Sequence, residues 1–202
     1  MPFIGNKPTA VPLTSADLGD GIVTSAKIAN GTIIGDDINS TFDLTGKTVT
    51  GAGGITDIDM WRLNSNLNGD QTPIASNLER VDTDGFALLG TGMSEASGIF
   101  TFPNTGYWEI IAHFQFSSDA IDNQKTGFIQ TTTDNSTYDD ASHCVANFYS
   151  GSVLASANTN FIFYVSNTST HKVRFRVSTM GSSDLGSDTN ANFTFFTFKK
   201  LA

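Results

Sequence analysis

The sequence has little of several features that would define its class at once. A single cysteine, Cys144, rules out an internal disulfide framework. No apolar stretch approaches the roughly 20 residues that a membrane-spanning helix needs, so membrane insertion is not expected. The formal net charge is −9, whereas binding to a phosphate backbone needs a positive surface, and the charge therefore argues against nucleic acid as a partner.

The residues that are abundant favour β structure. Aromatic residues make up 11% of the chain, with sixteen phenylalanines, and charged residues make up only 15%. Helices would carry Ala, Leu, Glu and Lys on their surfaces, whereas Gly, Ser, Thr and Asn are common here. With 202 residues, the chain can hold one core and an appendage.

The strongest local pattern lies in Gly98–Ser117. Pro103 cannot donate to a strand ladder, so a bend is expected before the alternation begins. One face of the following segment carries Trp108, Ile110, Ala112, Phe114 and Phe116, and the other carries Tyr107, Glu109, Ile111, His113 and Gln115. This period of two predicts a half-buried strand, with Trp108, Ile110, Phe114 and Phe116 in the core.

Further short strands are expected on either side, each bounded by polar or glycine-rich turns. They cover Asp57–Asn66, Phe86–Leu89, Gly127–Thr132, His143–Tyr149, Asn160–Val165 and Lys172–Ser178, with Gln71–Asp82 as an irregular edge. Several strands at roughly ten-residue spacing indicate an all-β sandwich or barrel.

The C-terminal strand, Asn192–Leu201, is apolar on both faces. Phe193 and Phe195 occupy one face, and Phe196 and Phe198 occupy the other. A strand of this kind is covered on both sides, but only one side of it meets the core of a two-layer sandwich. We therefore assign these four phenylalanines to a subunit interface. Cover from a loop of the same chain is the alternative.

These strands resemble the globular head of complement component one-q, which belongs to the tumour necrosis factor (TNF) superfamily. The resemblance spans roughly Ile55–Ala202 and rests on the Gly-x-Phe-Thr-x-Pro segment at Gly98–Pro103, the Gly106-Tyr107 turn and the two aromatic strands. It implies a ten-stranded jelly roll that assembles as a homotrimer, with the last strand near the trimer axis. It also implies ligand binding rather than enzymatic activity.

The residues before this head differ from it in composition and in pattern. Residues 1–14 contain three of the five prolines and are interpreted as an extended attachment arm, with a disordered tail as the alternative. From Ser15 to Leu44 the sequence repeats every ten residues, which brings Leu18, Ile28 and Ile38 into register. Three chains wound together would bury this repeat, so these three residues are trimer-interface candidates.

The repeat resembles a phage tail-fibre stalk, and a low-complexity linker is the alternative. A glycine-rich joint, Gly46–Thr56, follows it without the spacing of a phosphate-binding loop. Residues 15–55 are therefore assigned to stalk and joint, and residues 56–202 to the head.

Few side chains suggest chemistry. The three histidines, His113, His143 and His171, lack the spacing of zinc ligands. His143 and Cys144 are adjacent, and neighbouring strand residues point to opposite faces, so they do not form a nucleophile and its base. No catalytic residue is assigned.

A polar loop contains Asp134, Asp139 and Asp140, which are weak candidates for calcium ligands because calcium takes carboxylate oxygens. Heads of the family that the sequence resembles often bind calcium near the trimer apex. The EF-hand pattern is absent, however, and solvated turns in which Asp bonds its own backbone are the favoured interpretation. No metal or cofactor is assigned.

Together these features predict a structural protein of a phage virion. We expect a short tail fibre or spike whose trimeric head binds a host-surface glycan or protein, and whose arm contacts other virion proteins. The first residues show no secretion signal, so synthesis in the host cytoplasm and a place on the virion surface are expected. The alternatives are a capsid decoration trimer and a glycan-cleaving spike, and the second would need a pair of flanking carboxylates.

Overall fold

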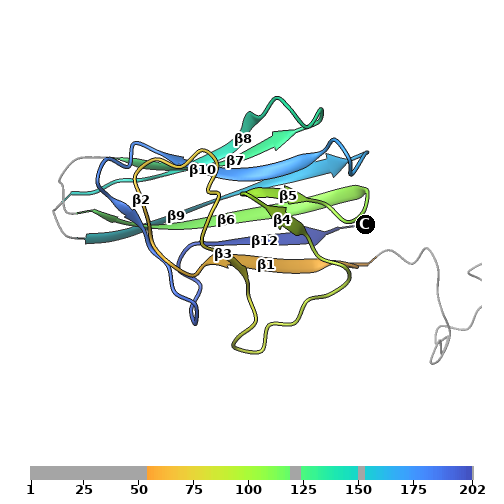
Figure 1. Cartoon of the computed structure of the whole chain (residues 1–202), viewed down its shortest axis with the longest axis horizontal. Helices are drawn as coiled ribbons and strands as arrows, with labels where there is room; N and C mark the ends of the chain where they lie inside the picture. The colour runs from red at the N-terminus through yellow and green to blue at the C-terminus, as the bar shows by residue number, and fades with distance from the viewer. Residues whose placement is uncertain (1–53, 119–123, 150–152, 202) are drawn as a thin grey trace, which may run out of the picture. The chain divides into compact units, whose positions relative to one another are not determined.

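The computed structural model describes residues 54–118, 124–149 and 153–201, which belong to one compact unit spanning Gly53–Ala202 (Figure 1). Within these ranges every regular element is a strand, and none is a helix that could cross a membrane. The expected arm, the repeat and its residues Leu18, Ile28 and Ile38 lie outside the described residues.

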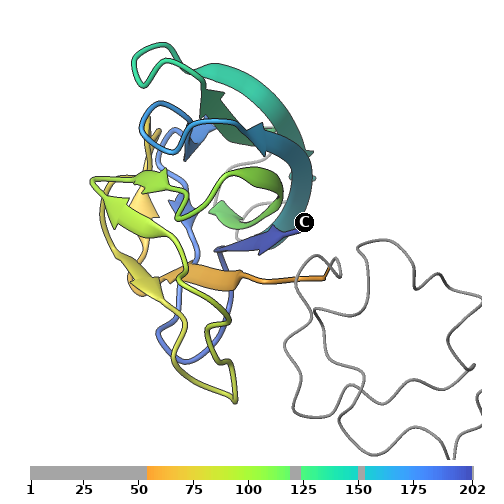
Figure 2. The ribbon, with the colours of Figure 1, turned by 90° about the vertical axis from the view of Figure 1, so that its right-hand side faces the viewer.

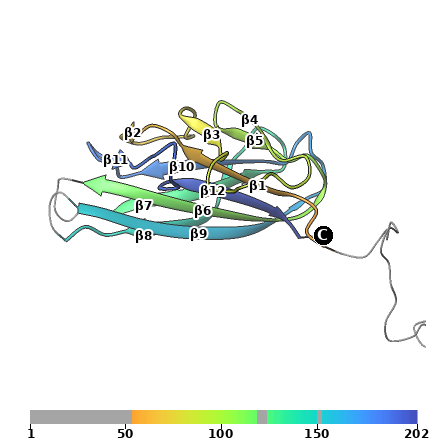
Figure 3. The same cartoon turned by 90° about the horizontal axis from the view of Figure 1, so that it is seen from below.

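The strands form two antiparallel sheets, which Figures 2 and 3 show from one end and from below. The first sheet has seven strands in the order β2-β11-β6-β12-β1-β3, with β9 on the free side of β6. These strands are β1 (Ile58–Leu63), β2 (Leu67–Asn68), β3 (Leu78–Arg80), β6 (Gly106–Ser118), β9 (Val153–Val165), β11 (Asp184–Leu185) and β12 (Phe195–Lys200).

The second sheet has five strands in the order β4-β5-β10-β7-β8. They are β4 (Ser94–Ala96), β5 (Ile99–Thr101), β7 (Lys125–Thr132), β8 (Asp139–Ala146) and β10 (Lys172–Ser178). The described residues thus form an all-β, two-layer sandwich with twelve strands, where the resemblance implies ten. The two shortest, β2 and β11, are two residues long and pair with each other.

Strand bounds agree with expectation where alternation is strong and differ elsewhere. The segment Lys172–Ser178 coincides with β10, whereas β8 begins and ends earlier than the expected His143–Tyr149. Strand β9 begins well before Asn160, because it pairs with β6 along the whole length of that strand. The segment Phe86–Leu89 is not a strand, and within it only Leu89 makes a bridge, to Ile58.

The core lies between the sheets and is built around β6. Its residues Trp108, Ile110, Phe114 and Phe116 are each fully buried, because the alternating side chains of one face all point at the second sheet. On the opposite side, Val173, Phe175 and Val177 of β10 are buried as well. The aromatic rings in this layer contact one another through stacked and edge-to-face pairs.

The assignment of Phe196 and Phe198 to a subunit interface is wrong. Both are fully buried in the core of their own subunit, and the Phe196 ring stacks on Phe175 with the ring centroids 3.7 Å apart. Phe195 points to the other side of β12 and is half-buried, and Phe193, before the strand, is 37% exposed. One face of β12 therefore belongs to the core, and the other remains available.

A buried carboxylate fixes β1 against the turn that precedes β4. Asp59 is fully buried and accepts hydrogen bonds from the indole of Trp61 at 2.9 Å and from the backbone N–H of Met93 at 2.8 Å. The Arg80 guanidinium on β3 donates to both carboxylate oxygens, at 3.0 and 3.2 Å. The charge is thus paired and fully hydrogen-bonded, as a buried carboxylate must be to be tolerated.

We predict that replacing Gly127 by alanine destabilises the head. A Cβ atom at this buried position of β7 would collide with the ring of Phe114, which is itself enclosed by the core. Overpacking of this kind costs about 1–3 kcal/mol of unfolding free energy, measurable by urea denaturation followed by tryptophan fluorescence. Gly54→Ala is the control, because no atom lies within 4 Å of its added methyl group. Equal effects of the two substitutions would contradict this account.

Candidate functional site

The most distinctive surface of the head is the side of β6, β9 and β12 that faces away from the core, called here the outer face. Pairing of β6 with β9 places Tyr107 beside Tyr164 and Glu109 beside Ile162. Pairing of β6 with β12 places His113 beside Phe195. The outer face consists of Tyr107, Glu109, Ile111, His113 and Gln115 on β6, Leu154, Ser156, Asn158, Asn160, Ile162 and Tyr164 on β9, and Phe195, Thr197 and Lys199 on β12.

Large apolar groups on the outer face are open to solvent. Tyr107, Ile162 and Tyr164 are each exposed by just over half, and Leu154 is 67% exposed. Tyr107, Ile162 and Tyr164 lie together at one end of the face, whereas the exposed polar residues Ser156, Asn158 and Asn160 separate Leu154 from them. Scattered exposed apolar side chains are ordinary on protein surfaces, but a group on neighbouring strands, such as these three, marks an interaction site. The outer face is therefore the best candidate for a contact surface.

The aromatic groups of this face are held in place by contacts across strands. The rings of Tyr107 and Tyr164 lie 4.8 Å apart between centroids, and the imidazole of His113 stacks on Phe195 at 5.1 Å. Cross-strand pairs of this kind restrict side-chain rotamers. A partner would therefore meet a preformed surface and would have little side-chain entropy to remove.

The outer face has no net charge. Its two charged groups, Glu109 and Lys199, form an ion pair of 2.8 Å between the carboxylate and the ammonium. Depletion of charge together with enrichment in aromatic residues is typical of the central part of a protein–protein interface. Burial lowers the pKa of the half-buried His113 below its ordinary value, which favours the neutral imidazole on this face.

Part of this surface can be predicted from the sequence. Phe193 and Phe195 are predicted at a subunit interface, and Phe195 lies on the outer face. Leu154, Ile162 and Tyr164 of β9 are not among the predicted interface residues. A signal for the last two is present, because Phe161–Val165 is apolar at consecutive positions, the same two-sided pattern as in the last strand.

Two of the three acidic residues proposed as weak calcium ligands have other partners, and the third, Asp139, is exposed on β8. The carboxylate of Asp134 accepts 2.8 Å bonds from the backbone N–H groups of Ser136 and Thr137, and these hold its pKa far below the usual range. Asp140 accepts from Arg176 at 2.6 Å, which also lowers its pKa. Among the described residues, no three His, Cys, Asp or Glu side chains are gathered as a metal site.

The histidine and the cysteine of β8 lie on opposite sides of the strand. His143 is exposed and its ring lies 5.7 Å from that of Phe128, whereas Cys144 is half-buried and donates to the carbonyl of Gly127. Burial raises the pKa of the Cys144 thiol to about 11. A thiol with this pKa is almost entirely protonated at neutral pH and is a poor nucleophile.

Comparison with solved structures places the fold among TNF-like jelly rolls. A crystal structure of murine APRIL is similar with a TM-score of 0.56 and 12% identity, over 72% of this chain and 98% of that chain. The structure of Eiger TNF from S. frugiperda is similar with a TM-score of 0.55 and 12% identity, over 72% of this chain and 92% of that chain. Identities this low establish the fold alone. No protein-family model and no curated protein matches the sequence.

We predict that His113 makes the folded head less stable as the pH falls. Because the pKa of His113 is lower in the folded chain than in the unfolded chain, the unfolded chain takes up the proton first. The free energy of unfolding of the wild type should therefore fall relative to that of His113→Gln below about pH 6.5. Urea unfolding of both proteins, at one protein concentration over a pH series, measures this difference. A difference that is independent of pH through this range would refute the prediction.

Proposed function

We propose that the chain is a homotrimeric structural protein of a phage virion, a short tail fibre or spike whose head binds a host-surface receptor. The observation that carries the self-association is the outer face, which has no net charge, is preformed and exposes large apolar groups of β6 and β9 beside the half-buried Phe195 of β12. Its place on a virion rests on the ten-residue repeat before the head, which resembles a fibre stalk.

A trimer is the assembly that the resemblance implies, and the outer face is suited to it. The last strand was expected near the trimer axis, and Phe195 of β12 belongs to this face together with β6 and β9. Burial of its apolar area against two other copies would remove it from water, at about 25 cal/mol of stabilisation per Å². The ion pair between Glu109 and Lys199 lets the only two charges of this face enter the interface as a neutral pair.

Trivalency supplies the mechanism of attachment. Three identical sites on one rigid head, and several heads on one particle, raise the effective affinity for a surface that carries many receptors. A single site then needs only weak affinity. The head would bind through positions away from the outer face, because that face is occupied by the neighbouring subunits.

A capsid decoration trimer is the second candidate. In this arrangement residues 1–14 would contact the shell, and the same trimeric head would project from it. Antibody raised against the head and imaged on intact virions distinguishes the two: label at the tail supports the fibre, and label over the shell supports the decoration protein. Absence of label from the particle would refute both.

We predict that Ile162→Lys dissociates the assembly. Each copy would then carry one uncompensated positive charge into the interface, because the neighbouring Glu109 is already paired with Lys199. Burial of three such charges would cost far more than the interface gains from the apolar contact that the isoleucine makes. Light scattering of the wild type should give the mass of three 21.6-kDa chains, and the variant should give one.

The matched control is Val145→Lys. It places the same charge at a residue that is 39% exposed on β8 of the other sheet, and it should leave the trimer intact. A wild type that is monomeric at every concentration would overturn the proposal. If both variants dissociate, the trimer stands but its interface can no longer be assigned to the outer face.

A further inference from the structure

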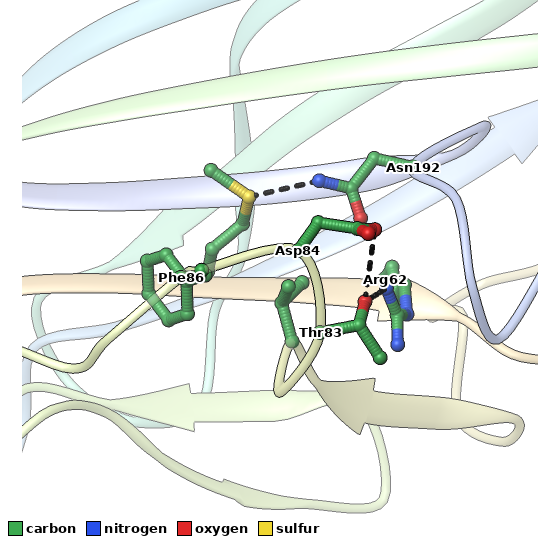
Figure 4. Close-up of a pocket in the computed structure, with 8 residues that line it drawn as sticks. Arg62, Thr83, Asp84, Phe86 and Asn192 are labelled. Carbon is green, nitrogen blue, oxygen red and sulfur yellow. Dashed lines mark hydrogen bonds between the residues drawn. The ribbon is translucent and has the colours of Figure 1, made fainter.

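A pocket with a volume of 340 Å³ lies over β1, beside the outer face (Figure 4). Met60 and Arg62 of β1 line it together with Thr83–Phe86 of the loop between β3 and β4 and with Asn192, which precedes β12. Small-molecule sites range from roughly 300 to 1,000 Å³, so this pocket has the size for one small ring rather than for a chain of them.

The pocket is preformed because its loop is fastened at both ends. The fully buried Arg62 donates to Glu79 at 2.7 Å, to the Thr83 hydroxyl at 2.9 Å and to Asp82 at 3.3 Å, which fixes the start of the loop. Two backbone hydrogen bonds between Leu89 and Ile58, of 3.0 and 3.1 Å, fix its end. A ligand would therefore enter without ordering the loop first, which favours affinity.

The polar groups in the pocket are mainly acceptors. The Asp84 carboxylate accepts one 3.2 Å bond from the Thr83 hydroxyl, and its second oxygen has no partner among the described residues. The Asn192 amide donates weakly to the Met60 sulfur at 3.1 Å, and its carbonyl oxygen is likewise free among these residues. In the view of Figure 4, the Phe86 ring lies apart from these polar groups. The pocket thus presents free acceptors and an aromatic surface to one ligand.

The charge of the pocket disfavours an anion. Arg62 is the cation of this group, and it is already paired with the carboxylates of Glu79 and Asp82. Asp84 adds a further negative charge that has no ion pair among the described residues. A ligand that carries a carboxylate or phosphate would be repelled here, whereas hydroxyl groups would donate to the charged acceptor in strong hydrogen bonds.

We propose that this pocket binds one neutral sugar ring. The ring hydroxyls donate to Asp84 and to the Asn192 carbonyl oxygen, and the C–H face of the sugar packs against the Phe86 ring. Acidic sugars are rejected by the charge of Asp84. The assignment relies on the proposed function only for the source of the sugar, which is then a glycan of the host surface.

The test is ligand-observed saturation-transfer NMR on the full-length protein with the methyl glycosides of glucose, galactose, mannose, rhamnose and N-acetylglucosamine. At least one neutral glycoside should receive saturation at millimolar concentration, and N-acetylneuraminic acid should receive none. The proposal is overturned if no neutral glycoside binds, or if the acidic sugar binds as well as the neutral ones.

Variants assign the binding to this pocket. Asp84→Asn keeps the shape and removes the charge, so the affinity for the neutral glycoside should fall roughly tenfold. Phe86→Ala should weaken it as well. Asp139→Asn, which removes an exposed carboxylate from β8, is the matched control and should have no effect. Unchanged binding in Asp84→Asn, with its melting temperature equal to that of the wild type, would also overturn the proposal.

Light scattering of the same samples separates this inference from the proposed function. A trimer that binds no glycoside refutes the pocket assignment alone, and a monomer that binds one refutes the trimer alone. Binding by the Ile162→Lys variant but not by the wild type would mean that a neighbouring copy fills the pocket in the assembly, and it would overturn the assignment to a glycan.

Discussion

The stack of Phe175 on Phe196 is the contact on which the rest of the head depends. It joins the central strands of the two sheets, β10 and β12, with the ring planes only 3° from parallel. Phe100 of β5 meets both rings edge-on, so three strands share one aromatic cluster. The orientation of β12 follows from this contact. Because neighbouring residues of a strand point to opposite faces, the inward Phe196 places Phe195 on the outer face.

A second constraint acts at β1, which has one buried charged side chain on each face of the sheet. The inward-pointing Asp59 fastens the strand to Arg80 and Met93, and the outward-pointing Arg62 fastens it to the loop after β3. Each of the two is fully buried and each has its hydrogen bonds satisfied. Buried charges of this kind give little net stability, but removing one partner is costly, so they specify a single arrangement of the loops around them. The walls of the pocket are part of that arrangement.

Local pattern was sufficient to predict the strands in which one face is uniformly apolar. Trp108–Phe116 and Lys172–Ser178 alternate strictly, and both could be predicted from the sequence. The first half of β9 could not, because Ser156 to Asn160 are small or polar residues that resemble a turn, and only pairing with β6 makes them a strand. The early start of β8 could not be predicted either, because Asp139 and Asp140 become part of the strand through pairing with Thr131 and Gln130, beyond a bulge at Ala141.

The functional surfaces depend on contacts between distant parts of the chain, and this limits what a local pattern can predict. Phe195 could be placed outside the core from its own strand, but its neighbour His113 is known only through the pairing of β12 with β6. The pocket combines β1 with a loop some twenty residues later and with Asn192 near the C-terminus. No spacing in the sequence indicates that these residues meet, since the fold alone brings them together.

The alternation of β12 has a consequence for how such a protein can change over time. Odd-numbered positions such as Phe195 face outward, and even-numbered positions such as Phe196 hold the two sheets together. Selection for a new assembly can therefore act on one set of positions while the fold is maintained by the other. A single short strand thus allows the quaternary structure to diversify without passing through unfolded intermediates in evolution.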